Sequence, residues 1–119
     1  MNLTGFLSRL SEQPESIRFS DTIAVIDNNY DFSPIEFHCG KHKNAPGEHV
    51  RTCKIFAFAL LNGLSARQTL TCFGEFYRDD VLGNPTGEDH PNLREFSRRG
   101  WNGLYMDGSP LRLKKAAVA

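Results

Sequence analysis

The sequence has no excess of charge of either sign. It holds 14 Lys and Arg residues against 14 Asp and Glu residues, so its formal net charge at pH 7 is zero. Proteins that bind nucleic-acid phosphates usually carry an excess of basic residues, so no nucleic-acid partner is expected. Long apolar runs are missing too: the longest, IFAFALL at 55–61, falls far short of the about 20 residues that a spanning helix needs. We therefore expect no membrane partner.

Cysteine is scarce, and the N-terminus has no secretory leader. The three cysteines are Cys39, Cys53 and Cys72, and an odd, low number argues against a disulfide framework and indicates a reducing compartment. The first 16 residues, MNLTGFLSRLSEQPES, have no apolar signal-peptide core and are interrupted by Arg9, Glu12 and Glu15. We therefore expect no export by the general secretory pathway.

Apolar residues at helical spacing predict about five helices. They are expected around residues 3–10, 19–30, 53–62, 66–81 and 89–99. The third is apolar on most sides, which places it in the middle of the fold. SARQ at 65–68 has the pattern of a capping box, in which Ser65 and Gln68 satisfy each other's backbone N–H groups.

Two short stretches predict strands. IEFHC at 35–39 and LYMDG at 104–108 alternate apolar and polar residues, and we expect them to pair as a two-stranded ribbon laid on the helices. Residues 40–49 are polar and rich in turn formers, which predicts a surface loop. The predicted fold is a mostly helical α+β domain over residues 1–111, followed by a frayed tail over 112–119.

The stretch GEDHPNLREF at 87–96 combines a helix start with residues typical of active sites. Pro91 suits a first helical turn, and either Asp89 or His90 can cap the exposed backbone donors. Capping explains more of these residues than chemistry does, so we favour the structural interpretation. It leaves His90, Asn92 and Arg94 without a role, and an Asp–His pair can also act as a general base.

Tyr77, Arg78, Asp79 and Asp80 form a second polar group, within FGEFYRDDVLGNP. Its functional interpretation is a carboxylate pair that binds a metal or works as acid and base. The structural alternative, an ion pair of Arg78 with solvated carboxylates near a helix end, is favoured because a hard-metal site usually needs more oxygen ligands. Near the end of the second helix, Asp27 and Tyr30 are free to join a polar pocket.

Histidines and cysteines raise two further possibilities. His38, Cys39, His42 and His49 are zinc-ligand types, but their spacing matches no common zinc pattern, so a solvated loop is favoured. Cys53 and Cys72 fall on apolar helix faces, where buried, inert thiols are the usual case. A nucleophilic cysteine would need a base, and His90 is the candidate. We predict no metal and no cofactor.

At this point the sequence resembles a known family. The segments that carry the resemblance are FSDTIAVIDNNYDFSPIEF (19–37), CKIFAFALLNGLSARQTLTCFGEFYRDDVLGNPTGEDHPNLREF (53–96) and GWNGLYMDG (100–108). They are similar to the HopJ family, small bacterial proteins named after type III secreted effectors of plant-associated bacteria. The resemblance implies a bacterial cytoplasmic protein that a type III apparatus exports into a host cell. It implies no reaction, cofactor or catalytic residue.

Two functional hypotheses of different classes follow. In the first, which we favour, the protein is a binding module that recognises a host or bacterial protein through a polar cluster of Asp27, Tyr30, Tyr77, Arg78, Asn92 and Arg94, beside Asp80, Asp89 and His90. In the second it is a small cytoplasmic enzyme, with His90 as general acid–base and Asp80 or Asp89 as its supporting carboxylate. Binding is favoured because the sequence names no set of nucleophile, base and orienting group.

Overall fold

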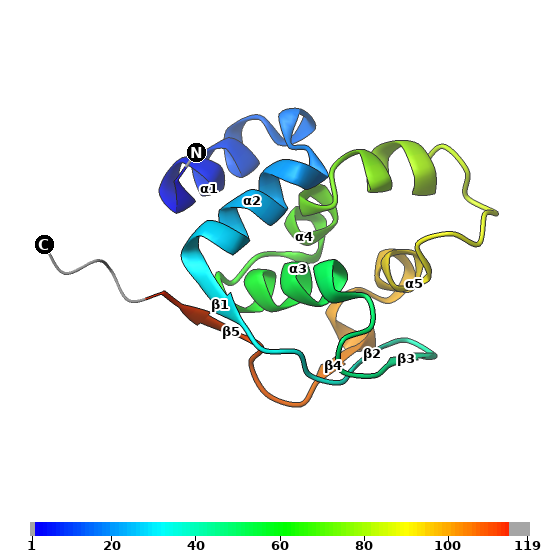
Figure 1. The fold of residues 1–119 in the computed structure, drawn as a ribbon. Helices are drawn as coiled ribbons and strands as arrows, with labels where there is room; N and C mark the ends of the chain where they lie inside the picture. Colours follow the sequence, from blue (N-terminus) through cyan, green and yellow to red (C-terminus); the bar gives the residue numbers. More distant parts are fainter. Residues whose placement is uncertain (1, 115–119) are drawn as a thin grey trace, which may run out of the picture.

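Helix α3 (Val50–Leu61) lies in the middle of the fold in the computed structural model, which describes residues 2–114 (Figure 1). Its buried residues are Cys53, Ile55, Phe56, Ala57, Phe58 and Ala59. Buried side chains on nearly every side require neighbours on nearly every side, which confirms the predicted central helix. Leu60 and Leu61, in its last turn, are 52 and 51 % exposed.

Two N-terminal helices cover one side of α3. Helix α1 (Leu3–Glu12) buries Phe6 and Leu10, as its spacing predicted, and the Asn2 side chain caps it by accepting from the Gly5 N–H at 2.7 Å. A 3-10 turn, η1 (Pro14–Ser16), leads into α2 (Phe19–Asn29). Arg18 is the N-cap residue of α2, and Asp21 accepts its backbone N–H at 3.0 Å.

The predicted capping box opens helix α4 (Ala66–Cys72). The Gln68 N–H donates to Ser65 Oγ at 3.1 Å, and the Ser65 N–H donates to Gln68 Oε1 at 3.0 Å. The expectation that this helix continues into the region of residue 82 was wrong. Gly74 adopts a left-handed conformation with φ of +57°, and the chain restarts as a π-helical segment, η2 (Phe76–Val81). Helix α5 (Pro91–Arg99) follows a long loop, with Pro91 in its first turn as predicted.

The predicted ribbon forms and is extended by a third strand. Strands β2 (Phe37–Cys39) and β4 (Leu104–Met106) pair antiparallel, with His38 opposite Tyr105, after a second 3-10 turn, η3 (Gly100–Gly103). Strand β3 (His42–Asn44) pairs with the other edge of β2. The loop predicted over residues 40–49 was therefore wrong for 42–44, where a turn at residues 40–41 folds the chain back as a hairpin.

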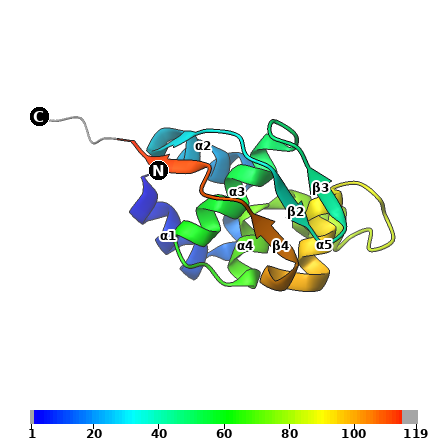
Figure 2. The same cartoon turned by 90° about the horizontal axis from the view of Figure 1, so that it is seen from below.

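A second small sheet pairs the segment after α2 with the last strand of the described chain. Strand β1 (Tyr30–Phe32), which follows α2 directly, pairs antiparallel with β5 (Leu111–Leu113). Arg112 and Leu113 were predicted to belong to a frayed tail, and this was wrong because they pair with Asp31 and Tyr30. Residues 115–119 of that tail lie outside the described residues. Both sheets lie on the same side of the helices (Figure 2).

Aromatic side chains fill the core between these layers. The Phe56 ring on α3 contacts those of Phe37, Phe73 and Phe96, with centroids 6.2, 5.6 and 5.0 Å apart, and so joins β2, the end of α4 and α5. The predicted mostly helical α+β class is confirmed. Within residues 2–114, no helix has the length and apolar character needed to cross a membrane.

Gly74→Ala should destabilise the fold much more than Gly63→Ala. Both glycines have positive φ, +57° and +63°, but a Cβ at Gly74 would lie 2.4 Å from the Phe19 backbone nitrogen, whereas one at Gly63 meets nothing within 4 Å. We expect losses in unfolding free energy of about 1 kcal/mol at Gly63 and at least about 3 kcal/mol at Gly74. Urea denaturation measures both, and equal losses would show that the close approach of α2 to Gly74 is unimportant.

Candidate functional site

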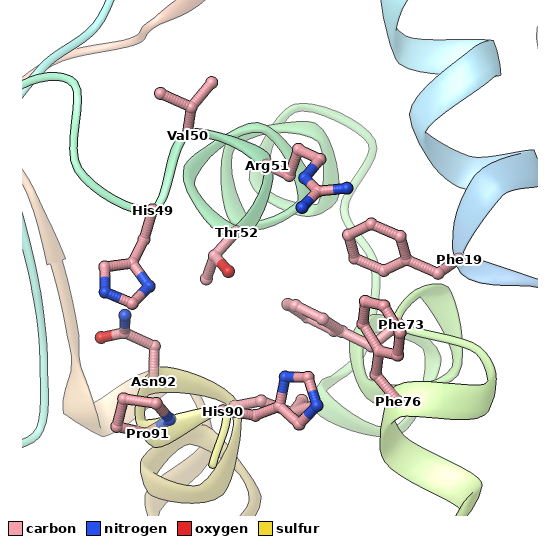
Figure 3. A pocket seen from close by; sticks show the side chains of 11 residues that line it. Phe19, His49, Val50, Arg51, Thr52, Phe73, Phe76, His90, Pro91 and Asn92 are labelled. Carbon is pink, nitrogen blue, oxygen red and sulfur yellow. The ribbon is translucent and has the colours of Figure 1, made fainter. Parts of the chain in front are cut away.

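A pocket opens between α2, α3, η2 and α5. Its volume is about 370 Å³. Phe19, Phe73 and Phe76 form one side, His49 and Asn92 face them across the opening, and the Thr52 side chain points into it from α3 (Figure 3). Arg51 lies on the same rim, with its guanidinium 5.4 Å from the Phe19 ring centroid. The pocket is therefore apolar on one side and polar on the other.

Two helices begin at this pocket, and a histidine in an unusual conformation precedes each. His49, before α3, has φ of +49°, and His90, before α5, has φ of +50°; within residues 2–114 these are the two non-glycine residues with positive φ. Neither helix has a side-chain cap. The backbone N–H groups of both first turns therefore remain available to a ligand, at the positive ends of two helix dipoles.

The His90 side chain contacts a carboxylate that is ten residues away in sequence. Its Nε2 atom lies 2.8 Å from Asp80 Oδ2 on η2 and 3.7 Å from Asp89 Oδ2. The imidazole also stacks on Phe76, with ring centroids 4.8 Å apart. The predicted capping role of His90 or Asp89 was wrong, because α5 has no side-chain cap and both side chains bind other groups instead.

The Arg94 side chain hydrogen-bonds to η2 and to the loop before α5. Its side chain is 4 % exposed and donates to the backbone carbonyl oxygens of Asp89, Asn84 and Asp80 at 2.6, 2.8 and 2.9 Å. It also donates to the Asp89 carboxylate, and this hydrogen bond lowers the pKa of that carboxyl group. Arg94 therefore fixes the backbone of η2 and of the loop before α5, and with it the positions of Asp80 and His90.

The structure joins four of the nine predicted site residues by direct contacts. Asp80, Asp89, His90 and Arg94 form one contiguous group. Asn92 borders the pocket, but its amide is paired with Asn44 through hydrogen bonds of 2.9 and 3.0 Å. The other predicted residues do not line this pocket.

Those remaining residues have local partners or face elsewhere. Asp27 pairs with Lys54 at 2.8 Å, and the Tyr30 hydroxyl accepts from Asn62 at 3.2 Å. Tyr77 lines a separate hollow beside α1 and α4. Arg78 forms no salt bridge among the described residues, and its Nη1 atom is buried without a hydrogen-bond partner there. Among the described residues, none of these four makes a hydrogen bond or ion pair with Asp80, Asp89, His90 or Arg94.

The three cysteines are buried, which does not favour a nucleophilic role. Burial raises the pKa of the Cys39 and Cys72 thiols to about 12 and that of Cys53 to about 11, so all three stay protonated near neutral pH. Cys39 donates its S–H to the Asn92 carbonyl at 3.2 Å. Among the described residues, the His38–His49 segment gathers no metal-ligand group; the one such group is Asp80, Asp89 and His90.

Several pocket residues escaped the sequence analysis. They are Phe19, Phe73, Phe76, Arg51 and Thr52, together with His49, which was considered only as a loop residue. In the sequence, the phenylalanines have the helical spacing that is typical of core positions. One usable signal was present: a histidine immediately precedes the first helical residue in both HVR (49–51) and HPN (90–92), where a capping residue is expected.

Comparison with known proteins places the chain in a family. The fold and the site define a small α+β protein with a pocket between two helix starts. The family model described as HopJ type III effector protein matches residues 3–111 of the chain. The chain belongs to the HopJ family. It is also similar to VPA0580, a protein whose crystal structure is described as of unknown function, with 48 % identity, 96 % of this chain and 95 % of that chain covered, and a TM-score of 0.94. The curated proteins give no match.

Arg94→Met should destabilise the protein, whereas Arg98→Met on the same helix should not. Removing the Arg94 guanidinium leaves part-buried carbonyl groups without a donor, which we expect to lower the unfolding free energy by about 3 kcal/mol. The Arg98 side chain is 60 % exposed, and its buried partner Glu95 keeps a closer cation, Arg99, at 2.8 Å, so the loss of Arg98 should stay within about 0.5 kcal/mol. Urea denaturation distinguishes the two, and similar losses would refute the structural role of Arg94.

Proposed function

We propose that this HopJ-family protein is an effector-type binding module and that the pocket between α2, α3, η2 and α5 holds its ligand. One observation carries the proposal: three phenylalanines face two uncapped helix starts across a cavity of about 370 Å³. Small-ligand pockets are typically about 300–1,000 Å³, mostly apolar, with few polar groups that fix orientation. The cavity fits that description.

The lining of the pocket indicates what kind of group would bind. Phe19, Phe73 and Phe76 offer ring faces to a flat apolar body. Opposite them, the first-turn N–H groups of α3 and α5 and the Arg51 guanidinium favour a negatively charged or strongly accepting end. The proposed ligand is therefore a planar apolar group that carries a carboxylate or similar anion, either a small molecule or part of a host or bacterial protein.

Binding can be tested with 1-naphthoate as the charged probe and 2-naphthol as the neutral one. We expect naphthoate to shift the backbone amide NMR signals of Arg51, Thr52 and Leu93, and to bind more tightly than naphthol because of its anionic end. Thr52→Phe should fill the pocket and abolish the shifts. Leu60→Phe, an enlargement at a 52 % exposed position of the same helix, should leave them unchanged. Shifts that persist in Thr52→Phe would place binding elsewhere.

The contact between His90 and Asp80 supports a second candidate function, an acid–base enzyme. A carboxylate 2.8 Å from Nε2 can orient the imidazole for general acid–base work. The two functions differ in what His90→Gln changes. In an enzyme this substitution removes conversion of the bound ligand, whereas a binding module converts nothing before or after it.

Export is the test of the effector part of the proposal. A C-terminally tagged chain should appear in the culture supernatant of a strain with a working type III apparatus and be absent from that of a strain without one. Helix α1 buries Phe6 and Leu10, so the N-terminal segment must unfold before it can enter the apparatus. Retention in both strains, with a known effector exported in parallel, would show that this member of the family acts inside the bacterium.

A further inference from the structure

We propose that Asp80, Asp89 and His90 bind a divalent transition-metal ion at the edge of the pocket. Asp80 Oδ2, Asp89 Oδ2 and His90 Nε2 all lie within 4.8 Å of one another, although they come from two separate chain segments. Asp80 lies on η2, and the other two residues immediately precede α5. This inference goes beyond the proposed function and does not depend on what the pocket binds.

The distances that join the free side chains are also close to those between the ligands of one ion. Ligand atoms about 2.1 Å from a metal stand about 3.0–3.5 Å from each other in tetrahedral or octahedral geometry. His90 Nε2 is already 2.8 Å from Asp80 Oδ2 and 3.7 Å from Asp89 Oδ2. Small rotations of the two exposed carboxylates would therefore complete a three-ligand site without movement of the backbone.

The surrounding contacts are of the kind that orient metal ligands. Arg94 occupies the other oxygen of Asp89, Oδ1, and so leaves Oδ2 for the ion. Phe76 stacks on the imidazole of His90 and fixes the plane of its ring. Partners that hold ligands in place in this way are a regular feature of metal sites. Two carboxylates against one guanidinium also leave the group with a net negative charge that a cation would offset.

The ligand set indicates the class of metal. One imidazole nitrogen with two carboxylate oxygens suits Zn²⁺, Mn²⁺ or Fe²⁺ better than Ca²⁺ or Mg²⁺, which prefer oxygen ligands throughout. Asp80 and Asp89 have side chains that are 42 and 54 % exposed, so solvent can supply the remaining ligands. An ion here would join η2 to the start of α5 and close the loop over residues 82–90.

The test uses the untagged full-length chain, stripped with a chelator and then dialysed against Mn²⁺ or Zn²⁺. Elemental analysis should find one ion per chain, and Mn²⁺ should show an electron-spin-echo modulation from one imidazole nitrogen. Asp80→Asn and His90→Gln should each weaken binding by more than about tenfold, since the loss of even an orienting partner typically costs about 10–100-fold. His90→Gln should also remove the nitrogen modulation.

Two substitutions nearby serve as matched controls. Glu88→Gln changes an exposed acid in the same loop, and His42→Gln changes a histidine of β3; both should bind the ion as the unchanged chain does. The ion should raise the melting temperature of the unchanged chain and not that of Asp80→Asn. The proposal is overturned if no ion is retained, or if binding survives both Asp80→Asn and His90→Gln. The naphthoate titration is run without metal, so either proposal can fail alone.

Discussion

The buried guanidinium of Arg94 is the interaction on which the site depends. A charge taken out of water is costly unless hydrogen bonds satisfy it, and Arg94 meets that condition by donating to three backbone carbonyl oxygens and one carboxylate. Each of these hydrogen bonds also fixes the position of the backbone group that accepts it. The loop between η2 and α5 must therefore wrap closely around the guanidinium, and Gly87 passes so near that a Cβ there would lie 2.6 Å from Arg94 Nη2. Asp80 and His90 meet because this loop is held closed.

Much of the fold could be predicted because it depends on local patterns. The helical spacing of apolar residues located α1, α3 and α5, and the Ser65–Gln68 pair located the start of α4. The errors occurred where distant residues decide the outcome. Gly74 ends α4 because the N-terminus of α2 lies against it, and β5 exists because β1 offers a free edge. Neither neighbour can be identified from the residues adjacent in sequence.

The candidate site could be predicted in part, for a related reason. The residues Asp80, Asp89, His90 and Arg94 were recognised by their chemistry, but their roles were assigned from local sequence, which made Asp89 and His90 a helix cap. The structure shows an uncapped helix instead, because Arg94 and Asp80 engage those two side chains. The aromatic side of the pocket could not be predicted, since a phenylalanine that lines a cavity has the same sequence pattern as one that fills the core.

His90 belongs to the pocket and to the carboxylate group at once. The ring lines the pocket, whereas neither Asp80 nor Asp89 does. Nε2 lies 2.8 Å from Asp80 and 3.7 Å from Asp89, so these carboxylates already engage the nitrogen that would act as an acid or base. This arrangement favours binding over acid–base catalysis unless the imidazole turns away from Phe76, on which it stacks. His90 would thus contact both a ligand in the pocket and an ion between the carboxylates.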